Sequence, residues 1–265
     1  PLAAADDLRT GISTVENLMV PKRLALYPGT ASALADFGTV SGMVFPVLMF
    51  PAAILFGLTE LLIPELARCH AAGSHLRIRY LVRKSLRVAL LYGALCGGIM
   101  FLCAKELGAG LYQSADAGRY LKWFSLFAIM LYLDAVTDAM TKGLGQQKAC
   151  VRYNILTSAM DVVFLYLLLP KYGMEGYFAS FLVTHLLNFG LSLRRLLKIT
   201  GEIIPFSVPA LGCSAAIAAV WGAGQIRGIP GQCGVFLCLL GSLLCLMQVV
   251  GKEDLFWLQG LIQRK

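Results

Sequence analysis

Charged side chains are scarce in this sequence. Asp, Glu, Lys and Arg make up 14% of the 265 residues, whereas a soluble domain carries about 25%. Apolar residues reach 58%, and the mean hydropathy is +0.71. This balance excludes an ordinary soluble domain and is typical of a polytopic membrane protein. The net charge of +8 comes without a basic tail or an aromatic-rich basic pattern, so we expect no nucleic-acid partner.

The sequence also lacks the motifs of enzymes and cofactor proteins. It holds no C-x-x-C pair, no zinc-ligand spacing, no phosphate-cradling loop and no nucleophile with its base. The segment 143–145 (Gly-Leu-Gly) is too short for a nucleotide site and predicts a turn. We therefore expect no enzymatic activity, no cofactor and no metal. The cysteines lie mostly in apolar runs and predict buried thiols rather than disulfides; they are Cys69, Cys96, Cys103, Cys150, Cys213, Cys233, Cys238 and Cys245.

Eight apolar segments are long enough to suggest membrane spans, so the predicted fold is an all-α bundle of about eight transmembrane helices. Pro46 and Pro51 should bend the second span. Gly93 and Gly97 in the third permit close helix contact. The expected spans are 2–26, 39–63, 88–107, 120–140, 151–169, 177–193, 210–226 and 235–250, with a loop at 108–118, a tight turn at 170–176 and an interfacial helix in the tail 252–265.

The first span is amphipathic. On a helix, Arg9, Ser13, Glu16 and Arg23 share one stripe, and apolar residues fill the opposite side. An ionised side chain in hydrocarbon is costly, so this stripe should face a cavity or a partner. Glu16 could line that cavity or could satisfy a neighbouring helix through Asn154, His185 or Asn188. The candidate substrate-cavity residues are Arg9, Ser13, Glu16, Asn17, Lys22 and Arg23.

Further polar residues occupy three later spans and are candidates for ion or proton coupling or for polar packing. Asp138 precedes Lys142 by four residues, which predicts an ion pair at the inner interface. Asp134 lies one turn deeper and is expected to pack against Asn154 or to sense an ion. The full set is Asp134, Asp138, Asn154, Asp161, His185 and Asn188.

The basic residues are distributed unevenly between the turns that join these spans. If the first span runs from inside to outside, the richer set lies inside, as the positive-inside rule requires. The C-terminus is then cytoplasmic, and inside cations contact anionic head groups. The inside set is Arg68, Arg77, Arg79, Arg83, Lys84, Arg87, Lys142, Lys148, Arg152, Arg194, Arg195, Lys198, Lys252, Arg264 and Lys265. The outside set is Lys22, Arg23, Lys105, Arg119, Lys122, Lys171 and Arg227.

Several motifs along the chain together resemble one family. They are GISTVENLMVPKRL, GTVSGMVFPVLMFPAA, LLIPELA, YLDAVTDAMTKGLGQQKACVRYNI and LLLPKYGMEGY. The chain resembles the stage V sporulation protein B-like polysaccharide exporters of the multidrug/oligosaccharidyl-lipid/polysaccharide superfamily, which includes the MATE transporters. The match extends over most of the chain.

The resemblance implies a flippase of two six-helix lobes around a central cavity, driven by an ion gradient if by any energy source. Residues 1–200 would be the C-terminal lobe, and 201–265 two extra helices with an interfacial tail. The chain starts at Pro1 with no signal peptide, so we expect a piece of a longer protein. The implied partners are a lipid-linked sugar or peptidoglycan-type precursor, the lipids of the bacterial cytoplasmic membrane and an N-terminal lobe of the same protein.

Three functions stay open at this point. The first is export of a lipid-linked glycan, in which Arg9, Lys22 and Arg23 would pair with the phosphates of the substrate. The second is a MATE-type drug or cation antiporter, for which acidic cavity residues would be expected. The third is a membrane scaffold of the spore-envelope or wall machinery, against which the polar stripe of the first span argues. Substrate identity, coupling ion and oligomeric state are not determined by the sequence.

Overall fold

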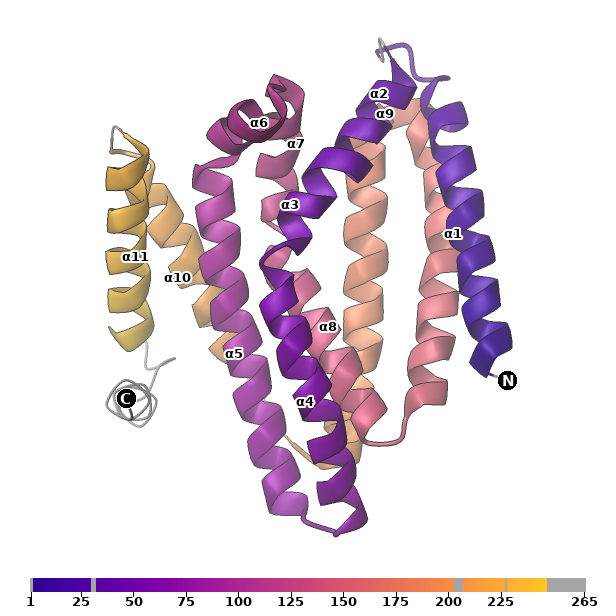
Figure 1. Cartoon of the computed structure of the whole chain (residues 1–265), viewed down its shortest axis with the longest axis vertical. Coiled ribbons are helices and arrows are strands. Elements are labelled where there is room, and N and C mark those ends of the chain that lie inside the picture. Colours follow the sequence, from indigo (N-terminus) through magenta and orange to yellow (C-terminus); the bar gives the residue numbers. More distant parts are fainter. Residues whose placement is uncertain (1, 30–31, 203–206, 227, 247–265) are drawn as a thin grey trace.

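The described part of the chain is a bundle of helices. The computed structural model describes residues 2–29, 32–202, 207–226 and 228–246, without the side chains of 2–7, 9 and 207–209. These residues form no strand, which confirms the predicted all-α bundle (Figure 1). The helices are α1 (Leu2–Leu24), α2 (Ala33–Thr39), the π-helix η1 (Val40–Val44), α3 (Phe45–Met49), α4 (Ala52–Ala71), α5 (His75–Leu102), α6 (Ala104–Tyr112), α7 (Ala115–Ser125), α8 (Ala128–Gly143), α9 (Gln147–Thr200), α10 (Ser207–Ala223) and α11 (Ile229–Leu246).

Helix α9 is two antiparallel arms joined at a sharp break. Gly173 has φ 57° and ψ −134°, which lies outside the helical region. The break falls inside the turn expected at 170–176, so the fifth and sixth predicted spans become the first arm (147–172) and the second arm (174–200). A side chain at Gly173 would meet the Tyr27 ring at 2.6 Å. The contact places the α9 break against the end of α1 (Figure 1).

Three helices of the described chain are long and apolar enough to cross a membrane, and up to five are if each bent pair is one span. The three are α5, α9 and α11, and the bent pairs are α2–α3 with α4 and α7 with α8. Together with α1, α10 and the division of α9, these segments correspond in position to the eight expected spans. Helix α1 does not meet this test, and α10 is shorter than a full span.

Proline explains one bend and not the other. The axis turns by 59° between α3 and α4, directly at Pro51, as expected. The hydroxyl of Tyr132 donates to the Leu48 carbonyl at 2.8 Å, and that of Tyr92 donates to the Pro51 carbonyl at 2.8 Å. These bonds satisfy backbone oxygens at the break in the way that an apolar environment demands. The bend of 57° between α7 and α8 has no proline and was not expected.

The loop expected at 108–118 is mostly helical, which corrects the sequence-based boundary. Helix α6 continues to Tyr112 and α7 begins at Ala115. Gln113 ends α6 with a left-handed backbone, and the Ser114 hydroxyl caps α7 by accepting from the Ala117 amide at 3.1 Å. Two short caps therefore replace the loop.

Glycine allows α5 to pack closely on α8, as the Gly93 and Gly97 spacing predicted. A methyl group at Gly93 would lie 2.8 Å from the Ile129 backbone, and one at Gly97 would lie 2.9 Å from the Ser125 carbonyl oxygen. Helix α10 and helix α11 form a pair on the other side of α5 (Figure 1). These two helices lie in the segment 201–265, where two helices were expected, and the tail helix expected at 252–265 lies outside the described residues.

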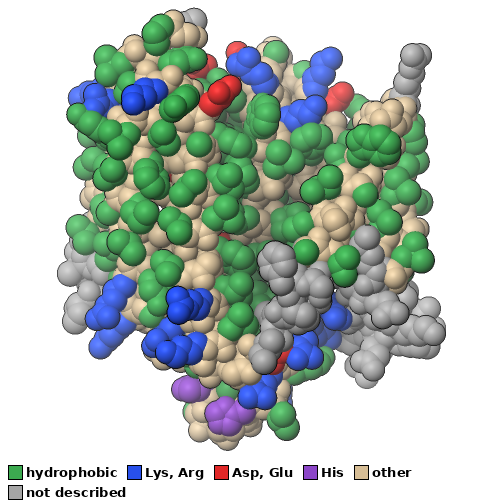
Figure 2. Space-filling model, turned by 180° about the vertical axis from the view of Figure 1, so that it is seen from behind, with side chains coloured by type: hydrophobic (Ala, Val, Ile, Leu, Met, Phe, Trp, Pro, Cys, Tyr) green, Lys and Arg blue, Asp and Glu red, His purple; other side chains and the backbone are tan. Residues whose placement is uncertain are grey.

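Charge gathers at the two ends of the bundle and leaves an apolar band between them (Figure 2). Some basic residues expected at lipid head groups have partners within the chain. Arg77 pairs with Glu65 at 2.6 Å, and Glu65 also pairs with Arg68. Arg83 pairs with the buried Glu202. Part of the basic charge expected inside therefore pairs with carboxylates elsewhere in the chain.

Candidate functional site

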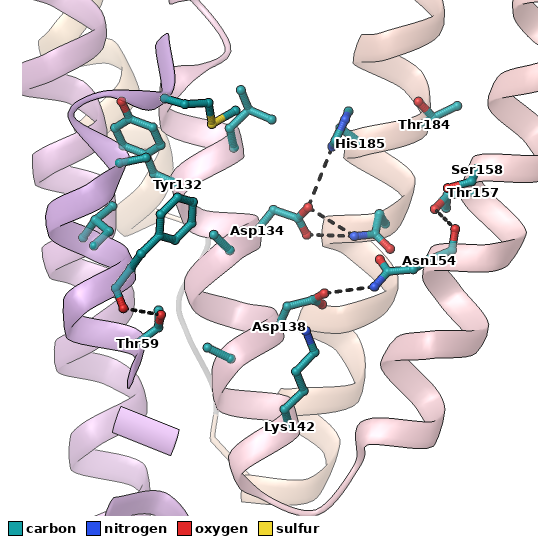
Figure 3. Close-up of a pocket in the computed structure, with 18 of the residues that line it drawn as sticks. Thr59, Tyr132, Asp134, Asp138, Lys142, Asn154, Thr157, Ser158, Thr184 and His185 are labelled. Atoms are coloured by element: carbon teal, nitrogen blue, oxygen red, sulfur yellow. Dashed lines mark hydrogen bonds and ion pairs between the residues drawn. The ribbon is translucent and has the colours of Figure 1, made fainter. Parts of the chain in front are cut away.

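A cavity of about 580 Å³ lies among α1, α4, α8 and both arms of α9 (Figure 3). Its walls combine apolar side chains with an unusual number of polar ones for the interior of an apolar band. The polar lining residues are Ser13, Glu16, Thr59, Glu60, Tyr132, Asp134, Asp138, Lys142, Asn154, Thr157, Ser158, Asp161, Thr184, His185 and Asn188. We call this space the central cavity.

One stripe of the second arm supplies most of the hydrogen-bond donors. Ser180, Thr184, Asn188 and Ser192 follow one another every four residues, and all are buried, with exposed fractions of 0 to 6%. An α-helix has 3.6 residues per turn, so a four-residue repeat drifts around the axis by about 40° per step. The stripe therefore faces different neighbours at its two ends. We call it the donor stripe.

The upper half of the donor stripe binds Asp161 of the first arm. The Ser180 hydroxyl donates to the Asp161 Oδ1 at 2.5 Å, and the Thr184 hydroxyl donates to the same oxygen at 3.2 Å. The two arms of α9 are thus joined across their break by a carboxylate and two hydroxyls. Buried polar groups need such partners because an unpaired one is costly in an apolar environment.

The lower half of the stripe binds two aspartates of α8. The Asn188 amide donates to both oxygens of Asp134 at 3.1 Å, and the His185 Nδ1 lies 3.8 Å from Asp134 Oδ2. The Ser192 hydroxyl donates to Asp138 Oδ1 at 2.7 Å. Each of the three aspartates on the cavity wall is therefore held by neutral donors of the second arm.

The contacts of Asp134 and Asp138 differ from those expected. Asn154 donates to Asp138 Oδ2 at 3.3 Å, so it serves Asp138 and not Asp134. Lys142, the expected ion-pair partner of Asp138, lines the cavity one turn below, and Asn154 donates to Asp138 from the first arm (Figure 3). Ser192 donates to the other oxygen of Asp138. The charge of Lys142 still acts on Asp138, and tertiary hydrogen bonds are added to this helix-local interaction because the three helices meet at this level.

The α1 stripe contributes two of its residues to the cavity. Ser13 and Glu16 line it, while Asn17 and Lys22 are exposed and do not. Arg23 packs over the Tyr166 ring, with its guanidinium carbon 3.2 Å from the ring centre. The side chain of Arg9 lies outside the described residues. Asn154, His185 and Asn188, proposed as neighbours of Glu16, contact the α8 aspartates.

Acidic groups outnumber basic ones in the cavity lining. The carboxylates are Glu16, Glu60, Asp134, Asp138 and Asp161, and the groups that can carry positive charge are Lys142 and His185. Glu60 and three residues of the donor stripe, Ser180, Thr184 and Ser192, were missed as site residues from the sequence, whereas Asn188 was among the candidates. The repeat of Ser, Thr, Asn and Ser at four-residue spacing would have indicated the stripe, because a buried helix face seldom carries small polar groups in register.

No group of three or more His, Cys, Asp or Glu side chains that could hold a metal ion occurs in the described part of the chain. The arrangement holds carboxylates around one cavity inside an apolar band: Glu16 on α1, Glu60 on α4, Asp134 and Asp138 on α8, and Asp161 on the first arm of α9. Such residues in membrane proteins mark paths for ions or polar substrates.

The fold and cavity together define a polytopic membrane protein with a polar interior site. The chain is 22% identical over 255 residues to stage V sporulation protein B of Bacillus subtilis (strain 168), an alignment covering 91% of this chain and 49% of that protein. The chain spans about half the length of this curated relative. No protein-family profile and no solved structure matches it.

Proposed function

We propose that the chain is one lobe of a flippase that moves a lipid-linked oligosaccharide or peptidoglycan-type precursor across the bacterial cytoplasmic membrane. The observation that carries this proposal is the central cavity, whose polar wall lies inside the apolar band. The similarity to stage V sporulation protein B over half of that protein supports a two-lobe arrangement. Residues 1–200 are then the C-terminal lobe of a protein of the multidrug/oligosaccharidyl-lipid/polysaccharide superfamily.

The lobe has a place for the substrate's phosphate at its inner end. A second hollow of about 570 Å³ at the α8–α9 turn is lined by Lys148, Arg152 and Arg195, with no carboxylate among its lining residues. The Gln146 side chain holds Arg195 in place, since its Oε1 accepts from Nη2 at 2.6 Å. This hollow offers positive charge to a lipid phosphate at the face where we expect the cytoplasm.

The acidic wall serves a different purpose in this proposal. A phosphate-bearing head group is repelled by Asp134, Asp138 and Asp161, so the wall is better suited to a cation or a proton that moves with the conformational cycle. Asn188 and His185 beside Asp134 provide neutral and titratable neighbours for such a step. The sugar phosphate would then be held by the other lobe and by basic groups at the rim.

Export of a drug or organic cation is the second candidate, because an acidic cavity is what a MATE-type antiporter requires. The two functions differ in substrate charge, and they separate experimentally. Full-length protein in vesicles should flip a labelled lipid-linked precursor, and cells lacking the protein should show unchanged susceptibility to cationic drugs. Drug sensitivity without any flipping would replace the first function by the second.

The flipping experiment has a matched control in the same chain. Asp134→Asn removes a carboxylate of the cavity wall, and Glu175→Gln removes an exposed one near the α9 break. The first change should reduce flipping and the second should not. Full-length protein that flips nothing but still supports envelope assembly would favour the membrane scaffold.

A further inference from the structure

Two cysteines far apart in the sequence meet at one end of the bundle. The sulfurs of Cys103 and Cys233 lie 3.5 Å apart. Cys103 stands at the joint of α5 and α6, and Cys233 lies in the first turns of α11. Both are half-buried, and no other pair of thiols within the described residues is recorded in contact. The two cysteines form no local motif, so this pair was not predicted from the sequence.

Helix packing brings the two sulfurs together. Phe236 is completely buried against Gly98, where a methyl group would lie 2.1 Å from the ring. This contact fixes the position of α11 along α5. Helices α5 and α11 run antiparallel (Figure 1). Cys103 follows Gly98 along α5 and Cys233 precedes Phe236 along α11, so both cysteines lie toward the same end of the bundle from the Gly98–Phe236 contact. The thiol contact therefore follows from the relative axial position of α5 and α11, and not only from the rotamers of the two cysteines.

The contact lies where the α10–α11 pair meets the rest of the bundle. Helices α10 and α11 share a cluster of small residues with α5, including Ala94, Ala215, Ala216 and Ala219. Both helices pack on α5 as their main support outside the pair. A covalent bond between Cys103 and Cys233 would attach the start of α11 to the α5–α6 joint. The α10–α11 pair would then have a second covalent attachment to the bundle, besides the chain that connects α9 to α10.

We propose that Cys103 and Cys233 form an oxidisable thiol pair that closes into an intramolecular disulfide by exchange with a low-molecular-weight disulfide. The Cys103 thiolate attacks the small disulfide, forms a mixed disulfide and releases one small thiol. The Cys233 thiolate then attacks the Cys103 sulfur and releases the second small thiol. Two protein thiols are oxidised to one disulfide, the small disulfide is reduced to two small thiols, and the two protons lost by the protein thiols are taken up by the two released small thiolates.

The geometry and the expected orientation both favour this reaction. A disulfide bond is about 2.0 Å long, so the sulfurs need to approach by about 1.5 Å. With the first helix running from inside to outside, the α5–α6 joint lies at the outer face, where thiols are exposed to oxidants. The disulfide ties the α10–α11 pair to the α5–α6 joint, and the loop of chain that it closes between residues 103 and 233 includes α8 and all of α9.

Oxidised glutathione is the probe that tests the pair in the full-length protein in its membrane. After treatment and blocking of free thiols, peptide mass spectrometry should find Cys103 linked to Cys233 and two fewer free thiols per chain. Dithiothreitol should restore them. Cys103→Ser and Cys233→Ser should each leave the remaining cysteine as a mixed disulfide with glutathione.

Cys96→Ser and Cys213→Ser are matched controls, since both residues are half-buried thiols of α5 and α10 outside the pair. They should preserve the link. The unmodified protein carries the decisive measurement, so a variant that fails to fold does not affect the test. Oxidation that links other cysteines first, or that leaves both thiols of the pair free, would overturn the proposal.

Discussion

At the scale of single residues, the unusual feature is that half-buried carboxylates inside an apolar band take their hydrogen bonds from neutral donors. Asp134, Asp138 and Asp161 accept hydrogen bonds from Ser, Thr and Asn side chains rather than from Lys or Arg. In an ion pair the positive partner neutralises the charge of the carboxylate, whereas neutral hydrogen-bond donors leave the negative charge uncompensated. The cavity wall therefore retains the capacity to attract a cation or to exchange a proton.

Ser192 is the residue whose loss should show the strength of these contacts. Ser192→Ala removes the 2.7 Å bond from the buried Ser192 to Asp138 and leaves one oxygen of this half-buried carboxylate with fewer donors. Hydrogen bonds to charged groups contribute about 1.5–3 kcal/mol, so unfolding in detergent should become easier by that amount. Denaturant-induced unfolding of the purified variant and of the unchanged protein would measure this difference in the free energy of unfolding.

Ser214→Ala is the control for the same chemical change. Ser214 is exposed on α10, and its hydroxyl bonds to the Leu211 carbonyl of its own helix. Its replacement should alter stability by less than about 0.5 kcal/mol. Equal effects of the two substitutions would mean that the contact with Asp138 adds nothing to the fold.

Asp134 should matter more for transport than Asp138. Asp138 is bonded by Ser192 and Asn154 from two sides, which suits a structural role. Asp134 has Asn188 on both oxygens and the His185 Nδ1 3.8 Å from Oδ2, so of the three cavity aspartates in the described chain it has the shortest recorded contact with a group that can carry positive charge. In the flipping measurement, Asp134→Asn should lower the rate by about tenfold or more, the effect of about 1.4 kcal/mol. A silent Asp134→Asn beside an inactive Asp138→Asn would reverse these roles.

Glu16 tests whether α1 is part of the working surface. It lines the cavity opposite α8, and α1 packs closely on α9. Glu16→Gln keeps the shape and removes the charge, so the full-length protein should insert normally and transport less. The amount of protein in the membrane, measured together with the flipping rate, distinguishes impaired transport from failed insertion. Arg9→Ala is expected to act in the same direction by weakening substrate capture, and normal rates in both variants would make the stripe structural.

At the scale of elements, proline and glycine allowed prediction of the breaks that they cause. Pro51 marks the bend before α4 and Gly173 marks the break in α9, and both positions were readable because these residues restrict or widen the backbone. The bend between α7 and α8 carries no such residue. It depends on packing around Phe124 and Phe127, where aromatic rings from several helices meet, and such contacts have no local signature.

The break in α9 should depend on glycine. At φ 57° and ψ −134°, Gly173 is in a region that is strained for other residues by about 1–3 kcal/mol. Gly173→Ala should therefore lower the stability of the bundle by at least that amount, because the added methyl also meets the Tyr27 ring. Denaturation of the purified protein would measure the loss.

Gly190→Ala provides the comparison within the same arm. Gly190 is helical with no atom within 4 Å of an added methyl, so alanine should be neutral or stabilising by up to about 1 kcal/mol. If Gly173→Ala were equally harmless, the break would not rest on the glycine backbone.

The partners of the polar residues were harder to foresee than the helices. Sequence spacing placed Asp134 and Asp138 on one face and Asp161 in the next span, and these positions are correct. It could not assign Asn154 to Asp138 or Asn188 to Asp134, because that choice depends on the axial offset between α8 and the two arms. Contacts between helices are set by packing, while contacts within a helix are set by spacing.

At the scale of the whole molecule, the central cavity has walls of unequal character. Its α4, α8 and α9 sides are held by apolar packing and by the donor stripe, whereas the α1 side is joined to the bundle mainly through α9. The described part of α1 keeps exposed residues such as Leu18 and Asn17 beside cavity-lining Ser13 and Glu16. This edge of the bundle is the natural place for a second lobe to complete the enclosure.

The 265-residue chain alone should therefore not transport. Alternating access needs two bodies that move against each other around one site, and the matched relative is about twice as long as the aligned segment. Without a second wall, the carboxylates of the central cavity are open to lipid or water on one side, so a substrate cannot be released selectively. Vesicles with this chain should flip no labelled precursor above background, while vesicles with the full-length protein should. Flipping by the chain alone would require two copies to rebuild the cavity, which cross-linking and a steep dependence on protein density would reveal; flipping by a monomer would end the two-lobe proposal.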